Sequence, residues 1–231
     1  MMRVLVTGGG GYLGCLLVTR LLERGHCVRV FDRFCFGEEP MAGKLPFNLP
    51  PVYGGTEGGR LKKGRASLAD NPQCEIVRGD IRRLQEAPGL FDGIDAVAHL
   101  AALSHDPSCN LDPDMTADVN VESTRELANH ASRHGVKRFV FGSTCAVYGR
   151  GVFVSVDEES PPNPVSPFGA SKLEAERLLM QMQGEHFEPV IARTATMFGW
   201  SPRMRFDLAI NQMVASAMQH GCIRVMGGGN Q

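Results

Sequence analysis

The chain has 231 residues, enough for one large α/β domain or for one domain with part of a second. Hydrophobic residues make up 43% of the sequence, which supports a packed core, and a net charge of −1 does not point to nucleic acid or to an anionic membrane as a partner. No apolar stretch is long enough to cross a bilayer, and the first predicted strand begins almost at residue 1, so we expect neither a membrane span nor a signal peptide.

The first predicted strand covers residues 3–7 and leads at once into a glycine-rich turn over 8–14. A helix with leucines on one face is predicted next, followed by a strand over 28–31 that ends in Asp32. The leucines are Leu16, Leu17, Leu21 and Leu22. This order of strand, glycine turn, helix, strand and acid is typical of a dinucleotide-binding unit.

Each part of that unit has a physical role. Glycines adopt positive φ and let backbone N–H groups approach a pyrophosphate, and the positive end of the helix dipole faces the same anion. Asp32 lies where a carboxylate accepts hydrogen bonds from the adenosine ribose, and it would repel a 2′-phosphate. The sequence therefore favours NAD over NADP as the cofactor, although Arg33 directly after Asp32 weakens that preference.

After Asp32 the chain has one interruption and then alternates strands with helices. Residues 34–70 are rich in Gly, Pro and Lys and are predicted to form an irregular surface insertion. Its basic run over 60–65 is interpreted as a solvated loop, with phosphate or partner binding as the alternative. The further predicted strands cover 74–78, 94–100, 138–141 and 189–193, the helices cover 115–134, 171–183 and 207–220, and a strand-like segment covers 222–226.

This alternation predicts an α/β fold with a doubly wound parallel sheet, covered by helices on both faces. Ligands of such sheets bind beyond the carboxyl ends of the strands. The residues at these ends are Asp32, Asp80, Ala101, Thr144 and Thr194. Because a glycine-rich run over 227–229 is a poor place for a domain to stop, we expect the C-terminal region to be incomplete.

The cysteines and histidines are scattered, with no C-x-x-C pair and no spacing typical of a metal site. Most cysteines fall inside predicted strands or helices. We therefore expect buried, reduced thiols in a cytoplasmic protein that binds no metal. The cysteines are Cys15, Cys27, Cys35, Cys74, Cys109, Cys145 and Cys222.

A set of motifs, in order along nearly the whole chain, resembles one family. It is the extended short-chain dehydrogenase/reductases, in the NAD-dependent epimerase/dehydratase branch that acts on nucleotide sugars. The motifs are residues 7–14, 79–82, 99–102, 143–149 and 163–172, with Asn120 in its helix. Each motif is modest evidence alone, whereas the ordered set is specific.

The resemblance implies a Rossmann-type fold, with an NAD-binding domain over 1–193 and a small, partial substrate-binding region over 194–231. It also implies a nucleotide-diphosphate sugar as substrate and a homodimer formed through the two helices led by Asn120 and Phe168. Asp80 and Ile81 would flank the adenine, and Asn120 would have a supporting role. The implied cofactor-binding residues are Gly8, Gly11, Tyr12, Leu13, Gly14, Asp32, Arg33, Asp80, Ile81, Leu100, Ala101, Ala102 and Lys172.

Three positions carry the catalytic expectation. Thr144 takes the position of the family's Ser/Thr, which hydrogen-bonds the reacting oxygen, and Lys172 the position of its lysine, which holds the nicotinamide ribose. In the family a tyrosine one helical turn before this lysine removes the sugar hydroxyl proton, because the ammonium group lowers the phenol's pKa. This sequence has Phe168 there, and phenylalanine carries no ionisable proton.

Three explanations of Phe168 stay open: a deliberate substitution that traps a complex, a natural binder without ordinary turnover, or a base supplied by another group. Cys145 could be that base through its thiolate, or a small buried filler. Tyr148 is interpreted as packing beneath the site, and Tyr53 belongs to the insertion.

Candidate substrate contacts follow the fourth and sixth predicted strands. His105 and its neighbour Asp106 are expected either to touch substrate or to cap a loop. Arg203 and Arg205 are expected either to clamp a diphosphate or to pair with acids such as Asp207. The candidate set is Ser104, His105, Cys145, Thr196, Arg203 and Arg205.

The dehydratases of this family that act at sugar carbons 4 and 6 carry Asp-Glu directly after the threonine, and this chain has Cys145 and Ala146 there. The resemblance therefore favours nucleotide-sugar epimerisation or keto-reduction by reversible hydride transfer. The alternatives are a non-catalytic NAD(P)-binding regulatory or scaffold protein, and an oxidoreductase acting on a non-sugar alcohol or ketone.

Overall fold

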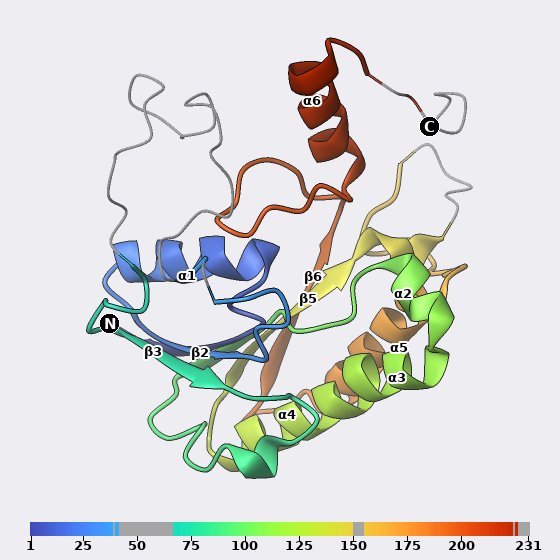
Figure 1. Ribbon diagram of the computed structural model, residues 1–231. Helices are drawn as coiled ribbons and strands as arrows, with labels where there is room; N and C mark the ends of the chain where they lie inside the picture. Colours follow the sequence, from blue (N-terminus) through green and yellow to red (C-terminus); the bar gives the residue numbers. More distant parts are fainter. Residues whose placement is uncertain (39, 42–66, 150–154, 224, 226–231) are drawn as a thin grey trace.

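The computed structural model of the chain describes residues 1–38, 40–41, 67–149, 155–223 and 225 (Figure 1). Most of the predicted insertion over 34–70, including Tyr53 and the basic run over 60–65, lies outside the described residues. No helix in the described part of the chain is long and apolar enough to span a membrane.

A parallel sheet of six strands in the order β3-β2-β1-β4-β5-β6 forms the centre of the described fold. The strands are β1 (Arg3–Thr7), β2 (Cys27–Asp32), β3 (Cys74–Arg78), β4 (Ala96–His99), β5 (Arg138–Thr144) and β6 (Glu188–Thr194). The helices are α1 (Tyr12–Glu23), α2 (Asp106–Leu111), α3 (Pro113–Ala117), α4 (Ser123–Arg133), α5 (Pro167–Gln181) and α6 (Ala209–His220), and the shorter turns are η2 (Leu84–Glu86), η3 (Asp118–Glu122) and η4 (Cys145–Tyr148). This order confirms the predicted doubly wound, Rossmann-type α/β fold.

The sheet is covered on both faces, with α1 on one side and α4 and α5 on the other (Figure 1). Val4 and Val6 pack in the cluster that contains α1, whereas Leu5 between them packs in the cluster that contains α4 and α5. A strand that is buried on both faces is apolar at successive positions, and β1 follows this rule at Val4, Leu5 and Val6. In the register of the sheet, Thr7 lies beside His99, and Thr144 lies beside Thr194. The carboxyl ends of the strands therefore meet at one edge.

Several predicted elements have different bounds. α5 begins at Pro167 rather than at 171, because the Ser166 side chain accepts a hydrogen bond from Gly169 N (3.2 Å) and proline suits the first helical position. The helix predicted over 115–134 is a continuous series of α3, the π-helical turn η3 and α4. The short helix α2 was not predicted, and β4 is shorter than the predicted strand over 94–100.

Two other expectations differ in part from the structure. In the segment predicted as strand-like over 222–226, the described residues Cys222, Ile223 and Val225 lie outside every strand, and α6 ends at His220 with Gly221 as its cap at φ +66°. The predicted leucine face of α1 is confirmed in part: Leu22 is buried, and the partly buried Leu17 and Leu21 pack against the same core cluster. The buried residues of α1 are Gly14, Cys15, Val18 and Leu22.

The cysteines are free, but only Cys15 and Cys109 are buried. Cys35, Cys145 and Cys222 are exposed, which corrects the expectation of buried thiols. Each of these three cysteines lies in a turn or just beyond a helix. Being close to a regular element in the sequence was therefore not enough to predict that a thiol is buried.

Gly14→Ala should lower the free energy of unfolding by about 2 kcal/mol. A Cβ at position 14 would lie 2.0 Å from the Gly8 carbonyl oxygen, so α1 would have to move off the loop, and alanine's better helix propensity offsets only part of that cost. Urea denaturation measures the loss. Gly184→Ala is the matched control, because a Cβ there meets nothing within 4 Å. Equal losses in the two variants would contradict the close approach of α1 to the loop.

Candidate active site

The glycine-rich turn after β1 forms one wall of the site. Gly8 has φ +72° and donates its N–H to Phe31 O (2.9 Å), and a Cβ on Gly8 would lie 2.6 Å from Ala101 N. The segment after β4 therefore lies directly against this turn. Gly11 caps α1 without any side-chain bond, and the first helical bond runs from Cys15 N to Gly11 O. The N–H groups of residues 12–14 thus have no acceptor within the helix, which suits a diphosphate.

Asp32 ends β2 and is held by the backbone on both carboxylate oxygens. Oδ2 accepts from Gly10 N (2.9 Å) and Oδ1 accepts from Phe34 N (2.7 Å). Phe34 has φ +54°, a conformation that non-glycine residues seldom adopt. Because each carboxylate oxygen has two lone pairs, Asp32 can still accept hydrogen bonds from two ribose hydroxyls. The geometry of the loop and Asp32 fits a dinucleotide.

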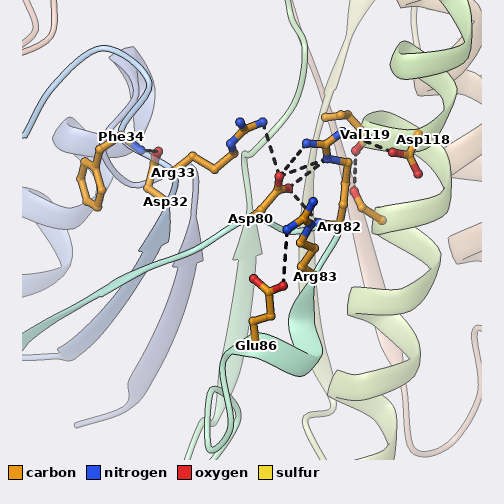
Figure 2. A network of polar contacts seen from close by, with 10 residues as sticks. Asp32, Arg33, Phe34, Asp80, Arg82, Arg83, Glu86, Asp118 and Val119 are labelled. Atoms are coloured by element: carbon orange, nitrogen blue, oxygen red, sulfur yellow. Dashed lines mark hydrogen bonds and ion pairs between the residues drawn. The ribbon is translucent and has the colours of Figure 1, made fainter.

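Asp80, which follows β3, is the centre of a charged network (Figure 2). Its carboxylate accepts from Arg82 Nη2 at 2.7 Å and from Arg82 N at 3.0 Å, and Arg33 Nη1 lies 3.4 Å away. Hydrogen bonds from Arg82 hold the pKa of Asp80 below its usual range, and the charge of Arg33 acts in the same direction. Arg82 also lies 3.5 Å from Asp118. The structure thus brings together Arg33 and Asp80, which the sequence analysis placed in the cofactor site separately.

His99 ends β4 and is a buried residue to which the sequence analysis gave no role. Its Nδ1 lies 2.6 Å from Thr7 Oγ1, and its Nε2 lies 2.9 Å from Thr124 Oγ1. Burial, with a smaller effect of the Lys172 charge, lowers the pKa of His99 to about 3, so the imidazole is neutral at neutral pH. Thr7 Oγ1 also accepts from Ala101 N (3.4 Å). This histidine fixes the ends of β1 and β4, where the segment predicted to line the cofactor starts.

Lys172 lies in α5 and is buried, with an exposed fraction of 3%. Its Nζ donates to Gly142 O (2.8 Å) and lies 4.4 Å from the centre of the Phe141 ring. Burial lowers the pKa of Lys172 to about 8, although the Glu176 carboxylate one turn further along α5 opposes that shift. Spacing along α5 could have identified Glu176 as a charged neighbour of Lys172, because residues one turn apart share a helix face.

The packing of η4 against the first turn of α5 brings the positions of Thr144 and Phe168 together. The Thr144 hydroxyl caps η4 by accepting from Ala146 N (3.1 Å). A Cβ on Gly169 would lie 2.7 Å from Ala146 O, so the first turn of α5 packs directly on η4. Both side chains are half-buried, and Lys172 lies one helical turn beyond Phe168. The three predicted catalytic positions are therefore gathered at the end of β5.

Asn120 ties this region to the segment after β4. Its side-chain amide accepts from Leu103 N (2.9 Å) and donates to Leu103 O (3.0 Å) and to Ser171 Oγ (3.0 Å). Ser171 Oγ in turn donates to Phe168 O (2.9 Å). Asn120 thus reaches α5 through the neighbour of Lys172. Its place in the π-helical turn η3 was not predictable from apolar periodicity.

The two candidate arginines have different partners. Arg205 forms an ion pair with Asp207 and also donates to Ser104 Oγ (3.3 Å). Of the two roles expected for Arg205, a diphosphate clamp or an ion pair with a nearby acid, its geometry matches the ion pair. Arg203 lies 3.8 Å over the Phe36 ring, next to the end of β2, and burial lowers its pKa below the usual range. The Arg203 side chain therefore packs on the segment that follows β2, and its role in a diphosphate clamp stays a prediction.

The remaining candidates are mostly exposed. His105 Nδ1 lies 3.1 Å from Ser108 Oγ in α2, Thr196 is exposed, and Cys145 is exposed rather than a buried filler. Tyr148 is held in place, since its hydroxyl donates to Asp157 O (2.7 Å) and accepts from Arg193 Nη1 (2.8 Å). The geometry of Tyr148 is that of a packing residue.

Residues after β6 attach to the glycine turn through Tyr12. The Tyr12 hydroxyl donates to Gly199 O (2.6 Å) and accepts from Asn211 Nδ2 (3.3 Å). Ser201 Oγ donates to Tyr12 O (2.6 Å). Ser201 and Asn211 are buried, so this attachment is a packed contact between segments far apart in the sequence.

A doubly wound parallel sheet with a glycine-rich turn of the dinucleotide-binding type, an acid at the end of the second strand and a buried lysine is typical of a nucleotide-dependent enzyme of the Rossmann type. Residues 4–231 match the sequence model of the NAD dependent epimerase/dehydratase family. The chain belongs to that family, which confirms the resemblance stated from the motifs and confirms NAD as the cofactor of its class.

Particular relatives agree with this assignment. The chain is 31% identical over 212 residues to UDP-glucose 4-epimerase 3 of Oryza sativa subsp. japonica, covering 87% of this chain and 52% of that protein. Among solved structures, it is similar to an NAD-dependent NDP-hexosamine 5,6-dehydratase, TunA, involved in tunicamycin biosynthesis (TM-score 0.76, 27% identity, 100% of this chain and 66% of the other).

A second solved structure is MoeE5 in complex with UDP-glucuronic acid and NAD (TM-score 0.67, 27% identity, 93% of this chain and 60% of the other). The chain thus spans about half to two thirds of the length of these relatives.

Proposed function

We propose that the chain binds NAD and a nucleotide-diphosphate sugar, and that its reaction class is reversible hydride transfer leading to epimerisation or keto-reduction. The observation that carries this proposal is the convergence of Thr144, position 168 and Lys172 at the carboxyl end of β5, on the same edge of the sheet as the glycine turn and separated from it by β4. Family membership and the MoeE5 complex with a UDP-sugar and NAD support the same ligands.

The residues of the glycine turn would hold NAD by its diphosphate, and Asp32 by its adenosine ribose. Asp80 and Ile81 would line the adenine, and residues 100–102 would line the rest of the cofactor. Bound NAD supplies the hydride acceptor and donor. Lys172 would donate to the nicotinamide ribose and would place a positive charge near the reacting oxygen, because its ammonium group is held at Gly142 O.

Thr144 would donate a hydrogen bond to the sugar oxygen that loses or gains its proton. The missing step is removal of that proton, because Phe168 cannot accept one. Cys145 is exposed directly after Thr144 and is the residue that we propose as an alternative base. Tyr148 is a weaker candidate, because its hydroxyl is already engaged by Asp157 and Arg193.

Phe168 also favours a second candidate function, an NAD-binding protein that holds a sugar nucleotide without turnover. We further propose that residues 194–231 form part of the substrate-binding region, and that the chain pairs with a second copy through its helical face. Exposed apolar side chains support that face: Leu111 in α2, Met115 in α3 and Met180 in α5.

The test incubates the chain with NAD and a panel of nucleotide sugars, with NADH absorbance and sugar products measured from the same tubes. We expect NAD binding by calorimetry and a slow, sugar-dependent conversion with at least one substrate. The same panel with NADP in place of NAD is the control. Binding of NAD and a sugar nucleotide without conversion would support the second function, and no binding of either would overturn both.

A further inference from the structure

We propose that Asp80 is a specificity-determining residue for the cofactor: its carboxylate engages Arg33 and so denies that guanidinium to an adenosine 2′-phosphate. The inference rests on the proposed binding of NAD. It assigns to Asp80 a role in choosing between NAD and NADP, in addition to any contact with adenine. It would reconcile a preference for NAD with the presence of an arginine directly after Asp32.

The backbone places the three residues side by side. β2 and β3 are neighbours in the sheet, with Asp32 opposite Arg78, and Asp80 follows shortly after. Gly79 N donates to Asp32 O (2.9 Å), so the segment that carries Asp80 is hydrogen-bonded to the end of β2. Figure 2 shows the Arg33 side chain extending from the end of β2 toward Asp80 rather than folding back over the Asp32 carboxylate.

The two arginines at Asp80 are not equivalent. Arg82 is well packed, with an exposed side-chain fraction of 24%, and it contacts both carboxylate oxygens. Arg33 is 52% exposed and reaches one oxygen at 3.4 Å. Arg82 therefore anchors the carboxylate, and Arg33 is the weaker and more easily exchanged partner.

Loss of the Asp80 charge would affect the two arginines differently. Arg82 keeps Asp118 as a second acid, 3.5 Å away, whereas Arg33 has Asp80 as its one ion-pair partner among the residues that the structure describes. A freed Arg33 lies next in sequence to the acid that binds the ribose. Arginine is well suited to bind a phosphate there through its planar set of donors.

Two dissociation constants, for NAD and for NADP, are measured by calorimetry for five proteins: the unsubstituted chain, Asp80→Asn, Arg33→Ala, Asp80→Asn with Arg33→Ala, and Asp118→Asn. The readout is the ratio of the two constants. Any weakening of adenine binding that follows removal of the Asp80 charge affects both ligands alike. It therefore cancels in the ratio, which isolates the effect of the 2′-phosphate on binding.

We expect Asp80→Asn to shift the ratio toward NADP by about three- to tenfold, the range for a charge-assisted hydrogen bond discounted for exposure. Adding Arg33→Ala should remove that gain. Asp118→Asn is the matched control, since it removes a neighbouring charge whose one ion-pair partner in the described part of the chain is Arg82, and it should leave the ratio unchanged.

Arg33→Ala alone gives a test that does not depend on the packing of Asp80, because Arg33 is half-exposed. The ratio should change by less than about twofold, since Arg33 is already engaged. A selective loss of NADP affinity in this variant would overturn the proposal, as would a gain in Asp80→Asn that survives removal of Arg33. If the unsubstituted chain binds neither nucleotide, the proposed function fails as well, and normal NAD binding with an unmoved ratio refutes this inference alone.

Discussion

Phe168→Tyr should raise nucleotide-sugar conversion by about 10²–10⁴-fold, the usual contribution of a general acid–base group. The new hydroxyl would stand in the first turn of α5, on the face that carries Lys172 one turn later. The Lys172 ammonium group would stabilise the phenolate and lower the phenol's pKa. NADH absorbance and product analysis on the best substrate of the panel measure the gain.

Phe168→Leu is the matched control, because it changes the shape of the side chain without adding a proton acceptor. It should show no gain, and both variants should bind NAD as the unsubstituted chain does. If the unsubstituted chain converts sugar as fast as the tyrosine variant, position 168 is not the site of the base. In that case Cys145→Ser should abolish the activity, because the Cys145 side chain next to Thr144 is the alternative base that we propose.

Lys172→Met should change how the free energy of unfolding depends on pH. The pKa of Lys172 is about 8 in the folded chain, below the ordinary 10.5 that applies after unfolding. Between these values the unfolded state binds more protons, so stability from this group rises with pH. The free energy of unfolding of the unsubstituted chain, relative to the variant, should therefore rise by about 3 kcal/mol from neutral pH to above the unfolded pKa.

The comparison has to be made as a difference between two proteins. Burial raises the pKa of Cys15 to about 12 and of Cys74 to about 11, and these thiols make stability fall as pH rises above their unfolded value. That effect is common to both proteins and cancels in the difference. Lys137→Met is the control, because Lys137 is half-exposed and pairs with Glu188. An equal pH-dependent difference for Lys137→Met would contradict the role of burial at Lys172.

The parts of the fold that depend on short spacings were predictable. The glycine turn, α1 and Asp32 form one local unit, and its side-chain requirements appear directly in the sequence. The start of α5 also had a local signal, because Ser166 and Pro167 are a favourable cap and first residue. The prediction of a start at residue 171 did not use this capping signal, because the predicted bounds of the helix were taken from apolar periodicity.

Contacts between distant segments were not predictable in the same way. Tyr12 and Gly199 are 187 residues apart, and Glu176 and Arg193 are joined across the end of the sheet. Such pairs depend on where the folded backbone brings two elements together, and a charge pattern alone does not identify the partner. The exposure of Cys145 has the same origin, because it depends on how η4 packs against α5.

The attachment of Tyr12 to residues beyond β6 has a consequence for how the binding of one ligand affects the binding of another. Tyr12 stands in the first turn of α1, at the expected diphosphate site, and its carbonyl and hydroxyl hold Ser201 and Gly199. A dinucleotide that immobilises this turn also immobilises its partners, so the entropy lost on fixing them is already spent when the sugar nucleotide arrives. The two ligands should bind with positive cooperativity, and by thermodynamic reciprocity each should raise the affinity of the other by the same factor.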